Sequence, residues 1–565
     1  MIRGESNVGK MVRVKQTYKT RWSTLGIAVI CILFVLATLW SEQPPVPKGE
    51  NAPIEQFSAV RAMEHVRAIA QLPHPSGSVE NERVRTYLVE QMELLGLQPN
   101  VNTYPWTGQY RGISESFELH NIIGVHKGTK PGKALMLTAH YDSTPFGPGA
   151  NDDAVGVAAL LETARILQAS PPMDRDIWFV LTDGEEKGML GAEAFWFDNK
   201  VREQIGLVVN FEARGSRGPS IMFQTSRDNG KLISEFASFA VSPVSSSLLG
   251  DLYRTMPNDT DLTVSLNAGI PGLNFAYIDG WDKYHSEQDT PDNVTLATLQ
   301  HHGENALAAA KRFGNMDLEQ VNDSDRVYFN WFTMLLHYPA SWTIPMSILI
   351  GLGWLLCIVV LFRKKAIALK GMALSFLLTL GSIITSVVVA YLVFVGIMYI
   401  GSSVAGMPLQ SAFIPAQVNL AFVLIALLVH LVFTRLTRHR VNVLEMILTG
   451  MLFYFLLLIV VLGLIPGASY LFLLPLLIHC IVIGCTLHKR NPVIVLQRPW
   501  VSLVFALAPL TLTTSLFHLL YTGMPLQITV FTTVLCVLIF TLLQPLMTSL
   551  TMVRGSRSVK IVDSK

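Results

Sequence analysis

The sequence predicts a membrane protein that carries an α/β domain, in which a mostly parallel mixed sheet has helices on both faces. Of the 565 residues, 50% are hydrophobic and only 15% are charged, which is too apolar for a soluble protein of this length. Long uncharged runs lie near the N-terminus and from about residue 340 onward. Between them, short apolar runs alternate with a helical segment, which is typical of parallel strands joined by crossover helices.

The first long apolar run follows a basic segment. Residues 1–22 are rich in Lys and Arg, whereas residues 23–40 carry no charge and are just long enough to span a bilayer. A signal peptide is the alternative, but the run ends in Leu39 and Trp40, and a cleavage site needs small residues. We therefore expect an uncleaved transmembrane anchor. Either interpretation exports the chain that follows, because the positive flank stays in the cytoplasm.

A Pro-rich polar linker, residues 41–53, is predicted to lead into one globular domain at residues 54–325. Four short apolar runs in this domain are expected to be buried strands. They cover residues 134–139, 176–182, 206–211 and 271–278. Residues 154–168, between the first two runs, are helical in composition and period. In such sheets a site forms at the carboxyl ends of the strands.

Seven further apolar runs predict a C-terminal transmembrane region over residues 343–550. They lie at roughly 343–362, 372–400, 415–434, 444–464, 469–487, 501–521 and 525–550. Clusters of Lys and Arg follow the first, third, fifth and seventh of them. Eight spans in all would place every cluster, both termini and the tail at 551–565 in the cytoplasm. The 54–325 domain is then expected outside the cytoplasm.

All five cysteines lie in apolar runs, and none lies between residues 32 and 356. A disulfide framework and thiolate zinc ligands are therefore excluded from the 54–325 domain. This absence fits a bacterial cell membrane but leaves a eukaryotic organelle open. The net charge of +2 gives no reason to expect a nucleic-acid partner.

Acidic or histidine side chains follow every predicted strand of the domain. A single strand-end acid is commonly a turn residue or a cap, and Glu185 would also be favoured in the first turn of a helix. Repetition at the same end of parallel strands favours one shared site, because side chains at neighbouring strand ends can converge. The residues are His140, Asp142, Asp183, Glu185, Glu186, Glu212 and His285, and Tyr284 directly precedes His285.

The stretch AHYDSTPFGPGANDDAVG, residues 139–156, joins the first strand to the predicted helix. It combines His140 and Asp142 with a Gly-rich loop and two adjacent acids, Asp152 and Asp153. Imidazole nitrogen and carboxylate oxygen are donors that suit a divalent ion such as zinc. The sequence therefore predicts a metal site with hydrolytic chemistry.

Five motifs in a fixed order resemble the M28 family of zinc peptidases: AHYDS, GANDDAVG, DGEEKGMLGAEAF, NFEARG and YHSEQDT. The resemblance covers about residues 55–315 and implies a zinc exopeptidase-like domain. The anchor and the multi-span tail resemble, in general plan, the membrane-bound members related to endoplasmic-reticulum and vacuolar membrane metallopeptidases. The resemblance also implies a cis bond between Asp152 and Asp153.

The resemblance implies a role for each candidate residue. Two zinc ions would be bound by His140, Asp152, Glu186, Glu212 and His285, with Asp152 bridging them, because two nearby cations need a carboxylate between them. Glu185 would be the general base, Asp142 would orient His140, and Tyr284 would polarise the scissile carbonyl. Many soluble relatives have Asp at the position of Glu212, and both residues supply carboxylate oxygen.

We therefore expect a membrane-anchored zinc-dependent exopeptidase that acts on peptides, with an aminopeptidase favoured. One alternative is glutaminyl-cyclase-like acyl transfer, which resembles a one-zinc version of this site. Another is a non-catalytic peptide-binding or assembly module. A complete set of ligands argues against both. A transport function for the tail is disfavoured because its spans carry Asp, Glu or Lys only near their ends. The oligomeric state is not indicated.

Other polar residues carry weaker signals. Arg214 could meet a substrate carboxylate, but a surface position is favoured. Residues 258–261 either line a substrate pocket or form a plain turn. His301 and His302 fall in a predicted C-terminal helix of the domain and are not expected to be ligands.

Overall fold

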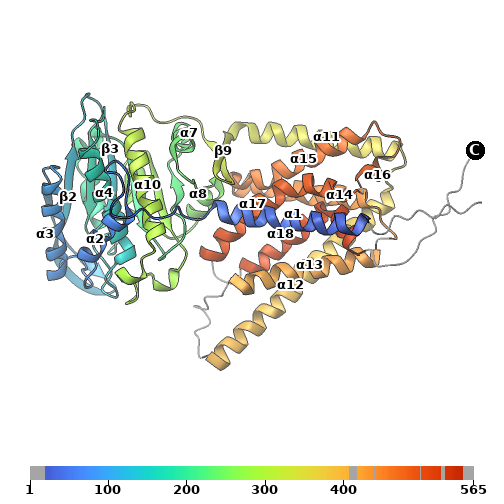
Figure 1. Cartoon of the computed structure of the whole chain (residues 1–565), viewed down its shortest axis with the longest axis horizontal. Helices are drawn as coiled ribbons and strands as arrows, with labels where there is room; N and C mark the ends of the chain where they lie inside the picture. The colour runs from blue at the N-terminus through green and yellow to red at the C-terminus, as the bar shows by residue number, and fades with distance from the viewer. Residues whose placement is uncertain (1–18, 406–415, 438, 497, 524–527, 552–565) are drawn as a thin grey trace, which may run out of the picture.

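The computed structural model describes residues 19–405, 416–437, 439–496, 498–523 and 528–551. An α/β domain and a bundle of long helices lie end to end along the long axis of the molecule (Figure 1). The predicted cytoplasmic segments at residues 1–22 and 551–565 lie almost entirely outside the described residues, so they remain predictions.

A seven-stranded mixed sheet forms the centre of the α/β domain, with the order β1-β2-β4-β3-β5-β7-β6. The four strands predicted from apolar runs are confirmed as β3, β4, β5 and β7, which are parallel neighbours. The flanking strands β1, β2 and β6 are antiparallel and were not predicted. The bounds are β1 (Asn100–Tyr110), β2 (Ile113–His126), β3 (Ala134–His140), β4 (Ile177–Thr182), β5 (Ile205–Ala213), β6 (Ile221–Thr225) and β7 (Gly272–Tyr277).

Helices cover both faces of the sheet, as predicted. Leu135 and Leu137 of β3 belong to the core cluster that includes α2, α4 and α10, whereas Met136 packs in the cluster with Phe195 and Trp196 of α5. This alternation follows from the period of two in a strand. The helices are α2 (Ala59–Ile69), α3 (Val79–Leu94), α4 (Val155–Gln168), α5 (Leu190–Trp196), α6 (Asn199–Gln204), α7 (Gly230–Phe239), α8 (Ser247–Tyr253), α9 (Asp261–Asn267) and α10 (Leu296–Phe313).

The domain is joined to the bundle by the hairpin of β8 (Arg326–Trp331) and β9 (Met334–Pro339). Figure 1 shows α8 and β9 at the junction between the two parts. Phe329 of β8 stacks on Tyr470 of the bundle with ring centroids 4.6 Å apart, and Leu248 of α8 lies in the same apolar cluster. The domain is therefore packed directly on the bundle.

The predicted linker at residues 41–53 lies against the domain. The backbone N–H of Lys48 donates to Gln300 at 2.9 Å, and its ammonium group contacts Glu304 at 2.8 Å. Both partners belong to α10, so this segment is held along the domain surface rather than extended away from it.

The bundle accounts for the predicted spans. Among the described residues, seven helices are long and apolar enough to cross a membrane by length and composition, and a bent pair could form an eighth span. The bounds are α1 (Lys19–Ser41), α11 (Thr343–Arg363), α12 (Leu369–Ala405), α13 (Ala416–Thr437), α14 (Val443–Leu464), α15 (Tyr470–Thr486), α16 (Pro492–Leu496), α17 (Val501–Gly523), α18 (Ile528–Leu542) and α19 (Gln544–Thr551).

The last predicted span, residues 525–550, is broken in the structure. Its described part forms α18 and α19, which are bent by 83°. Pro545 has no N–H to donate to the carbonyl of Thr541, so the helical hydrogen-bond ladder stops there. A count of apolar residues cannot detect this change of direction.

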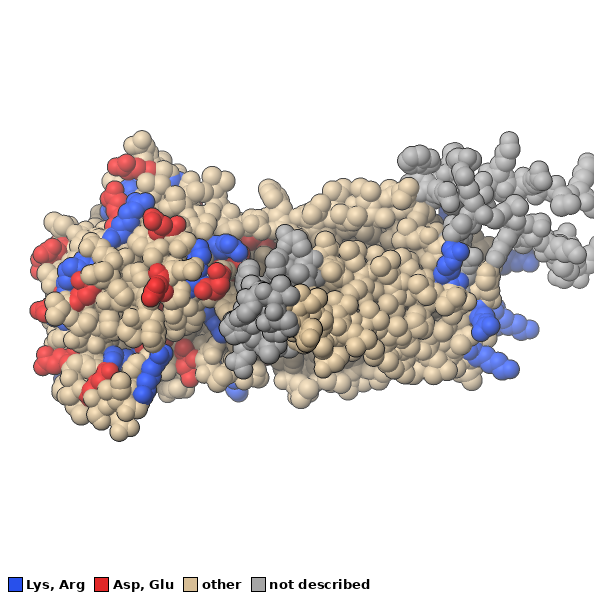
Figure 2. Space-filling view, turned by 90° about the horizontal axis from the view of Figure 1, so that it is seen from below, with Lys and Arg blue, Asp and Glu red and all other residues tan. Residues whose placement is uncertain are grey.

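Basic side chains gather at the end of the bundle that is distant from the α/β domain, while the belt between is free of charged residues on the face shown in Figure 2. Two of the predicted basic clusters meet there, because the Lys364 ammonium group donates to the carbonyl of Lys489 at 3.1 Å. This distribution matches the charge pattern expected from the sequence.

Two buried histidines of α10, His301 and His302, are hydrogen-bonded to Ser220. Ser220 donates its backbone N–H to Nδ1 of His301 at 3.1 Å, and its hydroxyl lies 2.8 Å from Nδ1 of His302. Burial lowers the pKa of His301 to about 4 and, together with the neighbouring His301, lowers the pKa of His302 to about 3. Both rings are therefore neutral in the folded chain, whereas in the unfolded chain they bind protons below the ordinary histidine pKa.

We predict that the free energy of unfolding falls as the pH drops below about 6.5, by up to about 1.4 kcal/mol per pH unit for each of the two histidines. His301→Asn keeps an acceptor for the Ser220 N–H and cannot titrate, so the variant should lose less thermal stability between pH 7.5 and pH 5. Thermal unfolding of the full chain in detergent measures this, with His488→Asn at an exposed position as the control. Equal losses in wild type and His301→Asn would contradict the prediction.

Candidate metal centre

The predicted site residues converge at the carboxyl edge of the four parallel strands. His140 is the last residue of β3, and Glu212 is the penultimate residue of β5. Glu185 and Glu186 follow β4, and His285 follows β7. Because these strands are neighbours and run the same way, their ends bring together residues that lie far apart in the chain.

Two groups of potential metal ligands form at this edge, and they share Asp152. One consists of His140, Asp152 and Glu212, and the other of Asp152, Glu186 and His285, with the donor atoms of each group within 4.8 Å of one another. Nε2 of His140 lies 3.1 Å from Oδ1 of Asp152, and Nε2 of His285 lies 3.1 Å from Oδ2. All five predicted ligands are therefore brought together, with the Asp152 carboxylate between the two imidazoles.

The electrostatics of the site reflect crowded, buried carboxylates. Burial, followed by the neighbouring Glu212, raises the pKa of Glu185 well above its usual range. Burial and the charge of Asp152 raise the pKa of Glu186 to about 8. Burial alone would lower the pKa of His285, but hydrogen bonds to Asp152 and Glu186 outweigh it and raise the pKa to about 10. Each negative charge in the centre thus disfavours the next, and a bound cation would stabilise the charged forms of the carboxylates.

The chemistry of the donors fits zinc. Imidazole nitrogens and carboxylate oxygens are its common ligands in proteins. Among the described atoms, Oε1 of Glu186 is buried and has no hydrogen-bond partner, so it is available as a donor to a metal. His140, which is 1% exposed, directs its other ring nitrogen, Nδ1, to the carbonyl oxygen of Asp142 at 3.0 Å. This contact leaves Nε2 facing Asp152.

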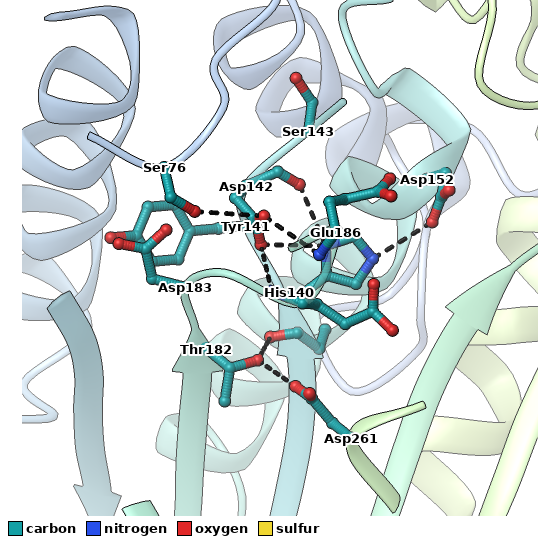
Figure 3. A network of polar contacts seen from close by, with 12 residues as sticks. Ser76, His140, Tyr141, Asp142, Ser143, Asp152, Thr182, Asp183, Glu186 and Asp261 are labelled. Carbon is teal, nitrogen blue, oxygen red and sulfur yellow. Dashed lines mark hydrogen bonds and ion pairs between the residues drawn. The ribbon is translucent and has the colours of Figure 1, made fainter. Parts of the chain in front are cut away.

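Asp142 contacts the backbone of a neighbouring turn as well as the imidazole of His140. Its carboxylate lies 3.5 Å from Nδ1 of His140 and accepts the backbone N–H groups of Glu185 at 3.1 Å and Glu186 at 3.3 Å. Figure 3 shows these contacts, together with the hydroxyl of Ser76, which donates to the same carboxylate at 3.3 Å. One buried acid therefore orients both the histidine and the turn that carries the two glutamates.

The turn between β4 and these glutamates depends on Gly184, which has φ +79°. A Cβ at this position would lie 2.6 Å from Cδ2 of Leu119. The positive φ and the close contact both favour glycine, and the sharp turn allows Glu185 and Glu186 to diverge.

A family comparison agrees with this geometry. The model of peptidase family M28 matches residues 121–310, which contain all five candidate ligands together with Asp142 and Glu185. On the basis of this match we call the α/β domain the M28 domain.

Curated relatives of the chain include an endoplasmic reticulum metallopeptidase and a vacuolar membrane protease. The chain is 29% identical over 330 residues to endoplasmic reticulum metallopeptidase 1 of Mus musculus, a match that covers 53% of this chain and 36% of that protein. It is also 29% identical over 307 residues to the vacuolar membrane protease of Schizosaccharomyces pombe, covering 52% and 36%. The chain thus spans about a third of the length of these relatives.

Among solved structures, the aminopeptidase from Aneurinibacillus sp. strain AM-1 matches with 15% identity and a TM-score of 0.39, covering 48% of this chain and 98% of that one. Porphyromonas gingivalis glutaminyl cyclase matches with 20% identity and a TM-score of 0.37, covering 44% and 96%.

The Asp152–Asp153 bond of the M28 domain is cis, as the resemblance implied. The loop that contains it is held by Asp289, a residue that the sequence did not single out. Asp289 is 3% exposed, and its carboxylate accepts the N–H of Asn151 at 2.7 Å, its side-chain amide at 2.8 Å and the N–H of Asp152 at 3.2 Å. Its position in the motif YHSEQDT was the one sequence feature that pointed to Asp289.

Asp261 is a second buried acid near the M28 centre that the sequence left undecided between a pocket and a turn. It is 2% exposed, begins α9 and accepts a hydrogen bond from the hydroxyl of Thr182. Burial and the charge of Glu212 raise its pKa to about 7. Asn258 and Asp259, in contrast, line a neighbouring cavity, whereas Arg214 is exposed.

Tyr284 and His285 lie in a loop after β7 whose backbone is held in an uncommon conformation. His285 has φ +54°, and its ring stacks on Tyr284 with centroids 3.7 Å apart. Burial and the charge of Asp152 raise the pKa of Tyr284, so its hydroxyl keeps its proton. The loop therefore places a donor beside the imidazole of the M28 centre.

We predict that Asp289→Ala lowers zinc affinity about 10–100-fold although Asp289 is not among the candidate ligands. Without this carboxylate, the N–H groups of Asn151 and Asp152 lose their buried acceptor and the loop is free to shift. Zinc titration of the purified full chain measures the loss, and the exposed Asp292→Ala is the matched control. Unchanged affinity in Asp289→Ala would show that the loop is held by other contacts.

Proposed function

We propose that the protein is a membrane-anchored zinc exopeptidase, and that it acts as an aminopeptidase on peptides. The observation that carries the proposal is the pair of ligand groups sharing Asp152, with Glu185 beside them and outside both groups. A glutamate that does not coordinate a metal but lies next to one is suited to act as a general base.

We propose that two zinc ions bind here. His140, Asp152 and Glu212 would hold one ion, and Asp152, Glu186 and His285 the other. When bound, the ions supply a water of lowered pKa and polarise the carbonyl of the substrate. The alternative, a glutaminyl-cyclase-like centre with one zinc, would leave one of the two groups unused.

The chain's own residues would then move the proton. Glu185 adjoins the candidate ligand Glu186 and lies close to Glu212, so its carboxylate is placed to accept a proton from water and to deliver it to the leaving amine. Asp142 fixes the backbone of Glu185 through the N–H that it accepts at 3.1 Å. Tyr284 keeps its proton and can donate to the developing charge on the carbonyl oxygen.

We further propose that the M28 domain lies outside the cytoplasm and that both termini lie inside. The basic residues at the distant end of the bundle support this orientation. A bent α18–α19 pair that counts as one span would give the even number of crossings that the orientation requires.

Glu185→Gln should abolish peptide hydrolysis and retain zinc, because an amide cannot accept the proton but leaves both ligand groups intact. Asp152→Asn should lose zinc as well, since both groups need its carboxylate. Zinc content and turnover of the full-length variants distinguish the two. An active Glu185→Gln variant would refute the assignment of the base.

Peptides with a free N-terminus should be cleaved and their N-acetylated counterparts should be resistant. The release of N-terminal residues from matched free and acetylated pairs, followed by mass spectrometry, tests the exopeptidase assignment. Equal cleavage of both members of a pair would exclude an aminopeptidase.

Tags at both termini should be protected from protease in sealed, right-side-out cells, whereas a tag inserted in the exposed β1–β2 turn at Arg111-Gly112 should be cleaved. Protection of all three tags, or cleavage of a terminal tag, would contradict the proposed orientation.

A further inference from the structure

The contact between the M28 domain and the helix bundle includes more than apolar packing. The turn Pro466–Ala468 joins α14 to α15, and we call it the docking turn. Its central residue, Gly467, donates its backbone N–H to Oδ2 of Asp251 at 2.7 Å. The carbonyl of Gly467 accepts the hydroxyl of Ser247 at 2.7 Å. Both partners belong to α8, so a single residue of the bundle is bonded to two successive turns of this short helix.

The docking turn fits closely against α8. A Cβ at Gly467 would lie 2.4 Å from the carbonyl oxygen of Ser247 and 2.7 Å from Oδ2 of Asp251. Ser247 is 8% exposed, and its hydroxyl also accepts the N–H of Tyr328 at 3.2 Å. Only glycine fits at position 467, because a Cβ there would displace α8.

The C-terminal end of α8 borders a cavity of about 430 Å³ in the M28 domain. Tyr253 and Arg254 line it on the α8 side, and the ring of Tyr253 packs edge-on against Phe223 of β6 at 4.8 Å. The hydroxyls of Thr225 and Thr263 on its wall are buried and have no hydrogen-bond partner among the described atoms. Such groups are suited to bond a polar ligand such as a peptide backbone.

A chain of buried amides connects this cavity with the metal centre. Gln224 on the cavity wall accepts from Asn274 at 2.9 Å. Asn274 accepts from Asn210 at 3.0 Å, and Asn210 also donates to Oε1 of Glu212 at 3.2 Å. The cavity therefore lies three hydrogen bonds from the candidate metal ligand Glu212, and the chain reaches it at Gln224 of β6.

From these contacts we propose that the helix bundle has a part in substrate binding: Gly467, Ser247 and Asp251 are positioning residues that hold α8 and so set the wall of the peptide-binding cavity. The proposal rests on the peptidase function proposed above. It gives the multi-span region a role beyond tethering, for which one span would suffice.

Gly467→Ala should displace α8 without touching the metal ligands. We expect KM for peptides to rise about fivefold, corresponding to the loss of about one hydrogen bond, with kcat and zinc content unchanged. Hydrogen exchange in lipid nanodiscs should show faster exchange of the α8 amides and unchanged exchange in α4. Gly463→Ala is the matched control and should behave as wild type, because a Cβ added at this glycine of α14 would meet no atom within 4 Å.

Milder variants at two positions of α8, Asp251 and Ser247, keep the test decisive if Gly467→Ala does not fold. Asp251→Asn retains an acceptor for the Gly467 N–H and should restore much of the affinity that Asp251→Ala loses. Ser247→Ala should raise KM less than Gly467→Ala does. Normal α8 exchange and normal KM in the folded variants would overturn the proposal, as would a fall in kcat or zinc content at constant KM. If the wild type cleaves no peptide, the peptidase function fails, whereas the exchange measurement still tests whether the docking turn holds α8.

Discussion

The carboxylate of Asp152 is the constraint on which the site depends. It lies between the imidazoles of His140 and His285, at 3.1 Å from each, and belongs to both ligand groups. An anion buried in this position is stable only with positive charge on either side. The β3–α4 loop, the ends of four strands and the β7 loop must therefore all be in place before the centre can form.

Two further acids, Asp142 and Asp289, position the backbone segments that carry the candidate ligands. Asp142 binds the turn that carries Glu185 and Glu186, and Asp289 binds the loop that carries Asp152. Each is buried and uses its carboxylate to accept backbone N–H groups, which places ligand-bearing segments rather than single side chains. The geometry of the centre is thus determined by main-chain hydrogen bonds as much as by the ligands themselves.

The sequence predicted those structural features that produce a recognisable pattern in a short stretch of residues. The central strands could be found because strands buried on both faces form continuous apolar runs, such as residues 134–139. The β1–β2 hairpin was missed because β1 and the first part of β2 form no continuous apolar run: their side chains are partly buried or exposed, and β2 becomes mostly buried only from Leu119 onward. Asp261 and Asp289 could not be assigned, since each resembles a turn or cap residue until tertiary contacts bury it. The break between α18 and α19 depends on one proline and the packing around it, which hydropathy averages conceal.

The apolar contact between the M28 domain and the helix bundle limits how such a protein can be divided or recombined. Leu248, Val327 and Phe329 belong to the M28 domain and its connecting hairpin, yet they are buried in the same cluster as residues of the bundle. Excised at residue 340, the domain would expose these apolar side chains to water and would be prone to self-association. The M28 domain is therefore not an interchangeable module, because a different transmembrane region could replace the bundle only if it reproduced the complementary surface.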